Sequence, residues 1–554
     1  MSSLAPALGQ IAVLVIALAI AVPLLGRYLA HVYTSTKHLA VERTSYRFLR
    51  VDPDADQHWK TYAMSALGFS LVSLLLLYAL GRLQDHLPLS LGFAALPSDG
   101  AWNTAVSFVA NTNWQWYSGE VTIGHLMQMS GLTVQNFVSA AVGMAVAAAF
   151  ARGLARSLTD GRVGNFWSDL VRGTLRVLLP ISAVSAIVLV SFGAIQNLMG
   201  SRTVETLSGG TQVITGGPVA SQEVIKQLGT NGGGFYNVNS AHPFENPTPF
   251  TDIFQIFLML LIPFAMAWAF GLIVKDRRQG VAILSVMTLL WGAAVALLTW
   301  AEMAGPGLAP HAAGGAMEGK EVRFGEAASS LFAASTTGTS TGAVNSMHDS
   351  LTAPGGGVAM FNMMLGEIAP GGVGSGLYGV LMLAIVTVFL SGLMVGRTPE
   401  YLGKKIGQRE IVLVALYVLA TPVLVLTGIA VAITASDGLA GLQESGPHGL
   451  SEALYAVTSA ANNNGSAFGG LTSGTPFWNT LLGLLMLLGR FLPMIFVLAL
   501  AGRFASQKRL PLGAGTLPTH SPLFVTLLSG VALVVVGLTY VPVLALGPIV
   551  ESLS

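Results

Sequence analysis

The sequence predicts an all-α polytopic membrane protein with ten transmembrane helices, built as four helix/pore-loop/helix repeats around one pore. Three observations lead to this prediction: ten long apolar segments, a short Gly/Asn/Thr motif that occurs four times, and basic residues concentrated in alternate loops. Of the 554 residues, 53% are hydrophobic and 10% are charged, whereas soluble domains have roughly 25% charged residues. This composition excludes an ordinary soluble globular fold.

The apolar segments set the number of membrane spans. A bilayer core about 30 Å thick is crossed by roughly 20 apolar residues in a helix. Charge-poor windows of this length lie at residues 5–26, 62–81, 125–150, 174–195, 253–274, 281–301, 358–396, 411–434, 477–500 and 522–546. No basic segment precedes the first window, and basic residues follow it, so we expect a retained anchor and not a signal peptide.

The loops between the windows differ in charge. Segments 27–60, 151–176, 275–278, 397–409 and 503–509 contain 21 of the 27 Lys and Arg residues. Because short basic loops stay in the cytoplasm, both termini are predicted outside. The net charge of +1 and the lack of long basic runs argue against a nucleic-acid partner. With no cysteine, the chain has no disulfide framework or thiolate nucleophile.

Four outside loops end in a short motif just before the next apolar window. The motifs are NTNWQ (111–115), GTNGGG (229–234), STGA (340–343) and NNNGS (462–466). Aligning Asn113 with Asn231 gives an offset of 118, and the motif glycines give offsets of 110 and 123. We therefore predict repeats at 60–156, 172–278, 279–405 and 410–509, with additional helices in 1–30 and 520–554.

The chemistry of the motifs suits a cation filter. Short amphipathic pieces at 102–110, 329–335 and 451–459 precede three of them and fit re-entrant pore helices. Backbone, hydroxyl and amide oxygens replace the water shell of a monovalent cation without a fixed charge. The motifs contain no charged residue, which disfavours a divalent-cation or anion site and favours potassium. A single such cluster is more often an ordinary turn, but four at matching positions favour a filter.

At these residues the sequence resembles the A subunit of the Kdp potassium-transporting ATPase, in the potassium transporter superfamily. The resemblance covers the whole chain and is carried by NTNWQWYSGE (111–120), GTNGGGFYNVNSAHPFENP (229–247), TGAVNSMHD (341–349), GEIAPGGVGSGLYG (366–379), GRTPEYLGKKI (396–406), TSAANNNGSAFGG (458–470) and GRF (489–491). It implies a subunit in the bacterial plasma membrane that takes potassium from outside. The ion would then pass through an intramembrane tunnel to a separate P-type ATPase subunit, and two smaller membrane subunits would complete the complex.

Several functional expectations accompany the resemblance. The phosphorylation motif DKTGT and a GxxxxGK[ST] loop do not occur in the sequence, so we expect no catalytic residue and no nucleotide site in this chain. The first alternative is a Trk/Ktr-type potassium channel or symporter subunit with a cytosolic gating ring. A membrane-embedded enzyme is a second alternative, but the spans contain no HExxH, GxSxG or paired-aspartate signature.

The resemblance assigns the potassium filter by position. The candidate ligands are Asn111, Thr112, Asn113, Gln115, Thr230, Asn231, Gly232, Ser340, Thr341, Gly342, Asn463, Asn464 and Gly465. In this alignment Trp114 stands opposite Gly232, so the filter is not strictly fourfold. In the third repeat, 335–338 offers a rival register to 340–342.

Two features inside the apolar windows suggest a gate or a tunnel. The seventh window is too long for one straight helix, and 366–376 contains one proline and five glycines, which predicts a broken helix. Gly371 and Gly372 are gating candidates, with a static kink as the alternative. Arg490 lies within a span, where an unpaired charge is costly. We hypothesise that it blocks a straight-through path, unless it has a structural partner, and that Glu367 pairs with it or lines the ion path.

Overall fold

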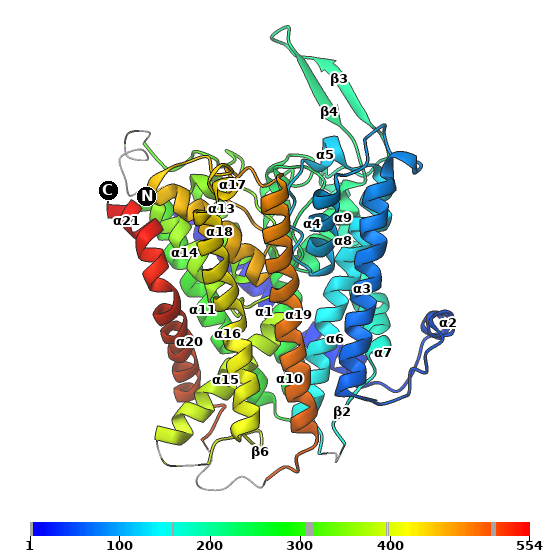
Figure 1. Ribbon diagram of the computed structural model, residues 1–554, viewed down its shortest axis with the longest axis vertical. Helices are drawn as coiled ribbons and strands as arrows, with labels where there is room; N and C mark the ends of the chain where they lie inside the picture. The colour runs from blue at the N-terminus through cyan, green and yellow to red at the C-terminus, as the bar shows by residue number, and fades with distance from the viewer. Residues whose placement is uncertain are drawn as a thin grey trace.

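The computed structural model describes residues 4–157, 160–304, 312, 314–394, 396, 398–510 and 517–553. Within these ranges, ten helices are long and apolar enough to cross a membrane. They run roughly parallel in Figure 1 and confirm the predicted all-α membrane fold. The ten spans lie at Ala7–Thr34, Trp59–His86, Met127–Ala155, Phe166–Ser191, Pro249–Ile273, Arg277–Ala304, Ser375–Met394, Gln408–Thr434, Pro476–Ala505 and Pro522–Leu553.

The helices follow one order four times: a long helix, a short helix, a loop and a second long helix. The long helices of the four units are α3 (Trp59–Leu83) with α6 (Val134–Ala155), α8 (Leu179–Ser191, continuing α7, Phe166–Arg172) with α10 (Pro249–Ile273), α11 (Arg277–Ala304) with α15 (Ser375–Met394), and α16 (Gln408–Thr434) with α19 (Pro476–Ala505). The short helices are α4 (Ser98–Val109), α9 (Val219–Leu228), α13 (Gly325–Gly338) and α18 (Gly446–Asn462). Helices α1 (Leu4–Thr34) and α20 (Pro522–Leu544) lie outside this plan, and the residue limits of the repeats stay predictions.

The short helices all lie in one half of the bundle, at the top of Figure 1. A hairpin of β3 (Ser201–Glu205) and β4 (Thr211–Thr215) projects from the same end, where both chain ends are marked. The other α-helices and strands among the described residues are small: α2 (Ala40–Leu49), α5 (Gly119–Thr122), α14 (Ala353–Met364), α17 (Ser436–Leu439), α21 (Val550–Leu553), and the paired strands β1 (Gln57–His58) with β2 (Arg162–Gly164) and β5 (Glu400–Tyr401) with β6 (Lys404–Lys405).

Several long helices begin at a Ser/Thr-Pro pair. The Thr248 hydroxyl accepts a hydrogen bond from the backbone amide of Thr251 at 3.2 Å, and Thr475 and Ser521 cap α19 and α20 in the same way. A proline follows each cap, where its missing N–H is not needed. The local sequence thus fixes the points at which these helices leave the loops.

Burial separates inner helices from outer ones. Helices α6 and α10 are buried along most of their length, whereas α1 and α16 present most of theirs to the outside. Because exposed apolar residues on outer helices contact lipid in a membrane protein, the inner helices are the ones that surround the loops.

The seventh window is broken, as predicted. Residues 353–364 form α14, residues 365–374 are not helical, and α15 begins at Ser375. Only α15 has the length of a span, so the membrane-crossing part is shorter than the predicted window 358–396.

Candidate ion-binding site

Hydrogen bonds at the ends of the short helices set the register of the motifs. The carbonyl of Ser107 in α4 accepts from the amide of Asn113 at 3.0 Å. The carbonyl of Lys226 in α9 accepts from the amide of Gly232 at 3.3 Å. Asn113 is therefore equivalent to Gly232, and the offset between the first two repeats is 119. The sequence alignment of Asn113 with Asn231 is wrong by one residue. Both motifs contain the pair Thr-Asn, which suggests that alignment, but the hydrogen bonds at the helix ends set a different register.

The corrected register places a residue with positive φ at the same position in every repeat. The φ angles are 55° at Asn113, 80° at Gly232, 70° at Gly342 and 100° at Gly465. Asparagine adopts positive φ more readily than other non-glycine residues. Trp114 follows this position and is not opposite Gly232, so at this position the first repeat has an asparagine in place of the glycine.

The four segments form a closed ring. An added Cβ would lie 1.8 Å from the Thr341 carbonyl oxygen at Gly232, 2.3 Å from the Asn464 carbonyl oxygen at Gly342, and 1.9 Å from the Thr112 carbonyl oxygen at Gly465. Asn113 completes the ring, because its side-chain amide donates to the Asn231 carbonyl at 3.0 Å. Each segment thus contacts the next in chain order, and the fourth contacts the first. A side chain at any of the three glycines would collide with its neighbour's backbone.

The ring contains backbone oxygens without protein partners. The carbonyls of Thr112, Thr341 and Asn464 are in fully buried residues and accept no hydrogen bond from any described residue. Buried carbonyls without a partner are uncommon in proteins and call for a water or an ion. Oxygen dipoles that carry no fixed charge suit a dehydrated monovalent cation.

The asparagine side chains tie the segments together. Asn111 donates to the Thr230 carbonyl at 2.8 Å, and Asn231 donates to the Asn111 side-chain oxygen at 2.5 Å. Asn463 donates to the Thr112 hydroxyl at 2.9 Å. These amide groups brace adjacent segments from behind, so the backbone oxygens, more than the asparagine side chains, are left to face an ion.

Gln115 lies at the outer edge of the ring. Its side-chain amide donates to the Gly234 carbonyl at 3.1 Å, and its side-chain oxygen accepts from the Gly234 amide at 2.9 Å. The residue also lines a cavity of about 640 Å³ that reaches Gly233, Gly342 and Gly465. Gln115 therefore joins the first and second segments at the mouth of the site.

The third repeat has one segment in the ring. Residues 335–338 form the last turn of α13, whereas Ser340, Thr341 and Gly342 follow the helix and contact the neighbouring segments. The Thr341 and Thr339 hydroxyls are 2.6 Å apart. The structure thus places 341–342 in the ring, whereas the rival register is helical and meets the fourth motif through the Thr336 carbonyl, which accepts from the Asn464 side chain at 2.9 Å.

A second, smaller cavity lies on the other side of the ring. It has a volume of about 100 Å³ and is lined by Ser340, Asn463, Glu367 and Arg490, and further along by residues of α15, α16 and α20. The Ser340 hydroxyl donates to Glu367, whose other carboxylate oxygen is buried and has no hydrogen-bond partner among the described residues.

Arg490 is buried in α19 and faces this cavity. In the described part of the chain its one hydrogen-bond partner is the carbonyl of Ser139, at 3.5 Å. Arg490 and Glu367 line the same cavity but are not within ion-pair distance in the structure, so the hypothesised pair is not formed. Tyr378 and Tyr417 line the cavity as well, and neither was among the candidate residues predicted from the sequence.

The segment between α14 and α15 packs against the ring. The Gly371 amide donates to the Gly338 carbonyl, and the Val373 amide donates to the Thr230 hydroxyl, both at 2.8 Å. An added Cβ on Gly371 would lie 1.8 Å from the Glu367 carbonyl oxygen, and one on Gly372 would lie 2.4 Å from the Ser340 hydroxyl. The segment therefore forms a closely packed floor under the second and third motifs.

Comparison with known proteins assigns the family. Residues 11–553 match the family described as Potassium-transporting ATPase A subunit. Proteins named Potassium-transporting ATPase potassium-binding subunit are similar over the whole chain: the one from Kineococcus radiotolerans is 60% identical over 100% of this chain and 99% of its own length, and the one from Mycobacterium avium is 59% identical over 100% of both.

A solved structure shares the fold. The potassium transporter TrkH from Vibrio parahaemolyticus superposes with a TM-score of 0.52 at 14% sequence identity, over 87% of this chain and 98% of that one. At this identity the likeness concerns the fold alone. The family match and the near-complete coverage of the curated relatives show that this chain belongs to the potassium-transporting ATPase A subunit family.

Proposed function

We propose that this chain is the potassium-binding and translocating subunit of an ATP-driven potassium uptake complex. The observation that carries this proposal is the closed ring of four motifs with unpaired, buried backbone oxygens. The relatives' name, potassium-binding subunit, supports potassium as the ion. The chain itself binds and passes the ion, while ATP hydrolysis belongs to a separate P-type ATPase subunit.

The ion path in this proposal has three parts. Potassium enters from the 640 Å³ outer cavity, loses its water at the ring, and reaches the 100 Å³ inner cavity. The lining of the inner cavity by residues of α15, α16 and α20 supports a sideways exit between these helices. This exit leads toward the ATPase subunit, which assembles with this chain and two smaller membrane subunits.

Two charged residues and a loop control the path beyond the ring. Glu367 offers the cation a carboxyl oxygen that has no hydrogen-bond partner among the described residues, and Arg490 repels the cation from the straight route across the membrane. Residues 366–374 gate the passage, because they pack against the second and third motifs and their first residues line the inner cavity. A buried arginine without an acidic partner is costly in a membrane, which supports a functional role for Arg490.

The filter is tested with Gly232→Ala in the assembled complex. The methyl group would collide with the Thr341 carbonyl, so we expect potassium affinity to fall by about tenfold or more, with weaker discrimination against rubidium and sodium. The larger Gly232→Asp should be more severe. Gly292→Ala in α11 is the matched control, since an added Cβ there has no atom within 4 Å. Native potassium affinity in Gly232→Ala would refute the filter.

The sideways path is tested with Arg490→Ala. We expect potassium to leak through vesicles that contain this variant without ATP, because the positive barrier is gone. If the Arg490→Ala complex assembles fully and its vesicles do not leak potassium, Arg490 has a structural role instead.

The fold shared with TrkH keeps a Trk/Ktr-type channel or symporter subunit as the alternative. Affinity purification separates the two functions. A P-type ATPase that is isolated with this chain supports the pump subunit, and a cytosolic nucleotide-binding ring supports the alternative.

A further inference from the structure

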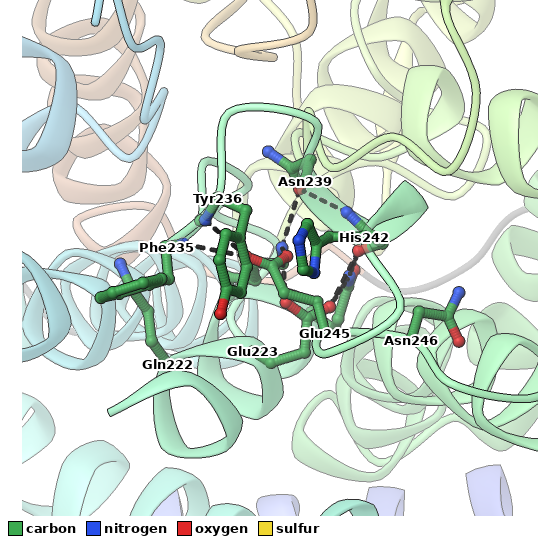
Figure 2. A network of polar contacts seen from close by, with 12 residues as sticks. Gln222, Glu223, Phe235, Tyr236, Asn239, His242, Glu245 and Asn246 are labelled. Atoms are coloured by element: carbon green, nitrogen blue, oxygen red, sulfur yellow. Dashed lines mark hydrogen bonds and ion pairs between the residues drawn. The ribbon is translucent and has the colours of Figure 1, made fainter. Parts of the chain in front are cut away.

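A buried ionic network lies behind the second motif (Figure 2). The ammonium group of Lys226, in α9, contacts Glu223 at 2.5 Å, Glu245 at 2.6 Å and the side-chain oxygen of Asn239 at 2.7 Å. The side chains of Lys226 and Glu245 are fully buried, and that of Glu223 nearly so. These residues lie outside the ring: Asn239 and Glu245 fall in the segment 229–247 that carries the family resemblance, whereas Glu223 and Lys226 precede it.

The network holds the second filter segment at both ends. At its start, the backbone carbonyl of Lys226 accepts from the Gly232 amide at 3.3 Å. At its end, one carboxylate oxygen of Glu245 accepts from the amides of Phe235 at 3.0 Å and Tyr236 at 2.9 Å. Because Lys226 and Glu245 also contact each other, both ends of the segment are fixed to one ion pair.

Between these ends, Gly234 packs closely against the ion pair. An added Cβ on Gly234 would lie 2.9 Å from the Lys226 nitrogen and 3.0 Å from a Glu245 oxygen. Gly234 also exchanges two hydrogen bonds with Gln115 of the first repeat. A shift of Glu245 would therefore move the second segment and its contact with the first.

The charges of the network balance. Burial opposes ionisation of Glu245, but the ammonium of Lys226 and the backbone amides hold its pKa below the ordinary value. Burial raises the pKa of Glu223 to about 8. Near neutral pH the network then contains one ammonium, one carboxylate and one carboxylic acid, a combination that can be buried without net charge.

We propose that Lys226 and Glu245 are positioning residues for ion discrimination: they fix the place of the second filter segment, and so the spacing of its carbonyls in the ring. This inference rests on the proposed filter. A rigid segment cannot contract or widen around an ion of another size, so its carbonyls replace the water shell of potassium better than that of sodium or rubidium.

The test uses the assembled complex in lipid vesicles, with uptake measured against potassium, rubidium and sodium concentration. Glu245→Ala removes two hydrogen bonds from the segment, and we expect the KM for potassium to rise about tenfold while the maximal rate stays within about twofold. Discrimination against rubidium and sodium should fall together with it. In Glu245→Gln one oxygen still accepts from the two amides, so the shift should be smaller and in the same direction, and this variant replaces Glu245→Ala if the latter does not assemble.

Rescue and control variants separate positioning from general stability. Lys226→Met/Glu245→Gln has no buried charge left at these two positions but keeps the amide-accepting oxygen, so it should discriminate better than Glu245→Ala. Arg152→Met in α6 breaks another buried ion pair, 2.5 Å from Asp169, that makes no contact with the ring. It should lower stability and leave discrimination native.

The outcomes are distinguishable. Native discrimination in the Glu245 variants, with a defect in Gly232→Ala, overturns the positioning role and leaves the filter intact. Native behaviour in both overturns the filter itself. An equal loss of discrimination in Arg152→Met shows that any buried pair has the same effect and also overturns the positioning role.

Discussion

The second and fourth repeats support the same ring in different ways. Behind the second, Lys226 and Glu245 hold the segment with full charges. Behind the fourth, His348, Tyr455 and Ser466 form a chain of hydrogen bonds of 2.7 and 2.8 Å that ends, at 2.6 Å, on the side-chain oxygen of Asn464. Because that oxygen can only accept, each hydroxyl in the chain donates toward the ring, and His348 donates from Nδ1 to the tyrosine oxygen.

The difference between the two networks predicts how each responds to mutation and to a change of pH. A charged network is strong while complete and leaves a bare charge when one member is removed. When one member of the neutral hydrogen-bonded network is replaced, the network loses only hydrogen bonds. A proton added to His348, however, has no carboxylate in that network to balance its charge. The two repeats should therefore differ in their sensitivity to mutation and to pH.

The largest effect is expected for Lys226→Met. Removal of the ammonium leaves the Glu245 carboxylate buried without a counter-charge, and breaking a buried pair from one side costs about 3–5 kcal/mol. Thermal unfolding of the purified complex measures the loss. A stability within about 1 kcal/mol of the native value would mean that water reaches the network and that the two supports do not differ as stated.

The matching change in the fourth repeat, Tyr455→Phe, should cost less. It deprives His348 and Ser466 of one hydrogen bond each, which corresponds to about 2–3 kcal/mol. The same unfolding experiment measures it beside Lys226→Met. A larger loss for Tyr455→Phe than for Lys226→Met would reverse the comparison.

Much of this fold could be predicted from the sequence, because membrane thickness fixes the length of apolar windows and basic residues mark alternate loops. The break before Ser375 was also predictable, because a proline and several glycines interrupt the apolar window there. The four motifs could be recognised as a set because each is a short run of Asn, Thr, Ser or Gly residues at the same place in its repeat, just before an apolar window.

The details of the site depend on three-dimensional contacts that could not be inferred from the order of the residues. The register of Asn113 was misjudged by one residue because the hydrogen bonds from the ends of α4 and α9 decide it. Lys226 and Glu245 are 19 residues apart, and although Glu245 lies in the quoted segment 229–247, nothing in the sequence pairs it with Lys226. Likewise, the separation of Glu367 from Arg490 follows from the packing of the loop before α15 against the ring.

Acid should weaken the fourth repeat's support. Burial and the nearby Lys320 lower the pKa of His348 to about 4, against about 6.5 in the unfolded chain. Below pH 6.5 the unfolded state binds a proton that the folded state does not, so stability falls by about 1 kcal/mol per pH unit down to pH 4. Melting temperatures from pH 7 to pH 4.5 measure this, and His348→Asn should flatten the slope. An unchanged slope in His348→Asn would assign the acid sensitivity elsewhere.

Alkali should have the smallest effect, and in the opposite direction. His448, at the start of α18, hydrogen-bonds Asp349 at 3.0 Å and Glu551 at 2.7 Å. These two carboxylates raise its pKa to about 10, so its contribution to stability is complete below pH 6.5 and is lost as the pH rises toward 10. The side chain is 27% exposed, and solvent screening should keep the loss below about 1 kcal/mol. His448→Gln should remove the decline in melting temperature between pH 7 and pH 10. If the decline persists in His448→Gln, His348 and His448 do not respond to pH in opposite directions, and the carboxylate partners of His448 do not account for the difference between them.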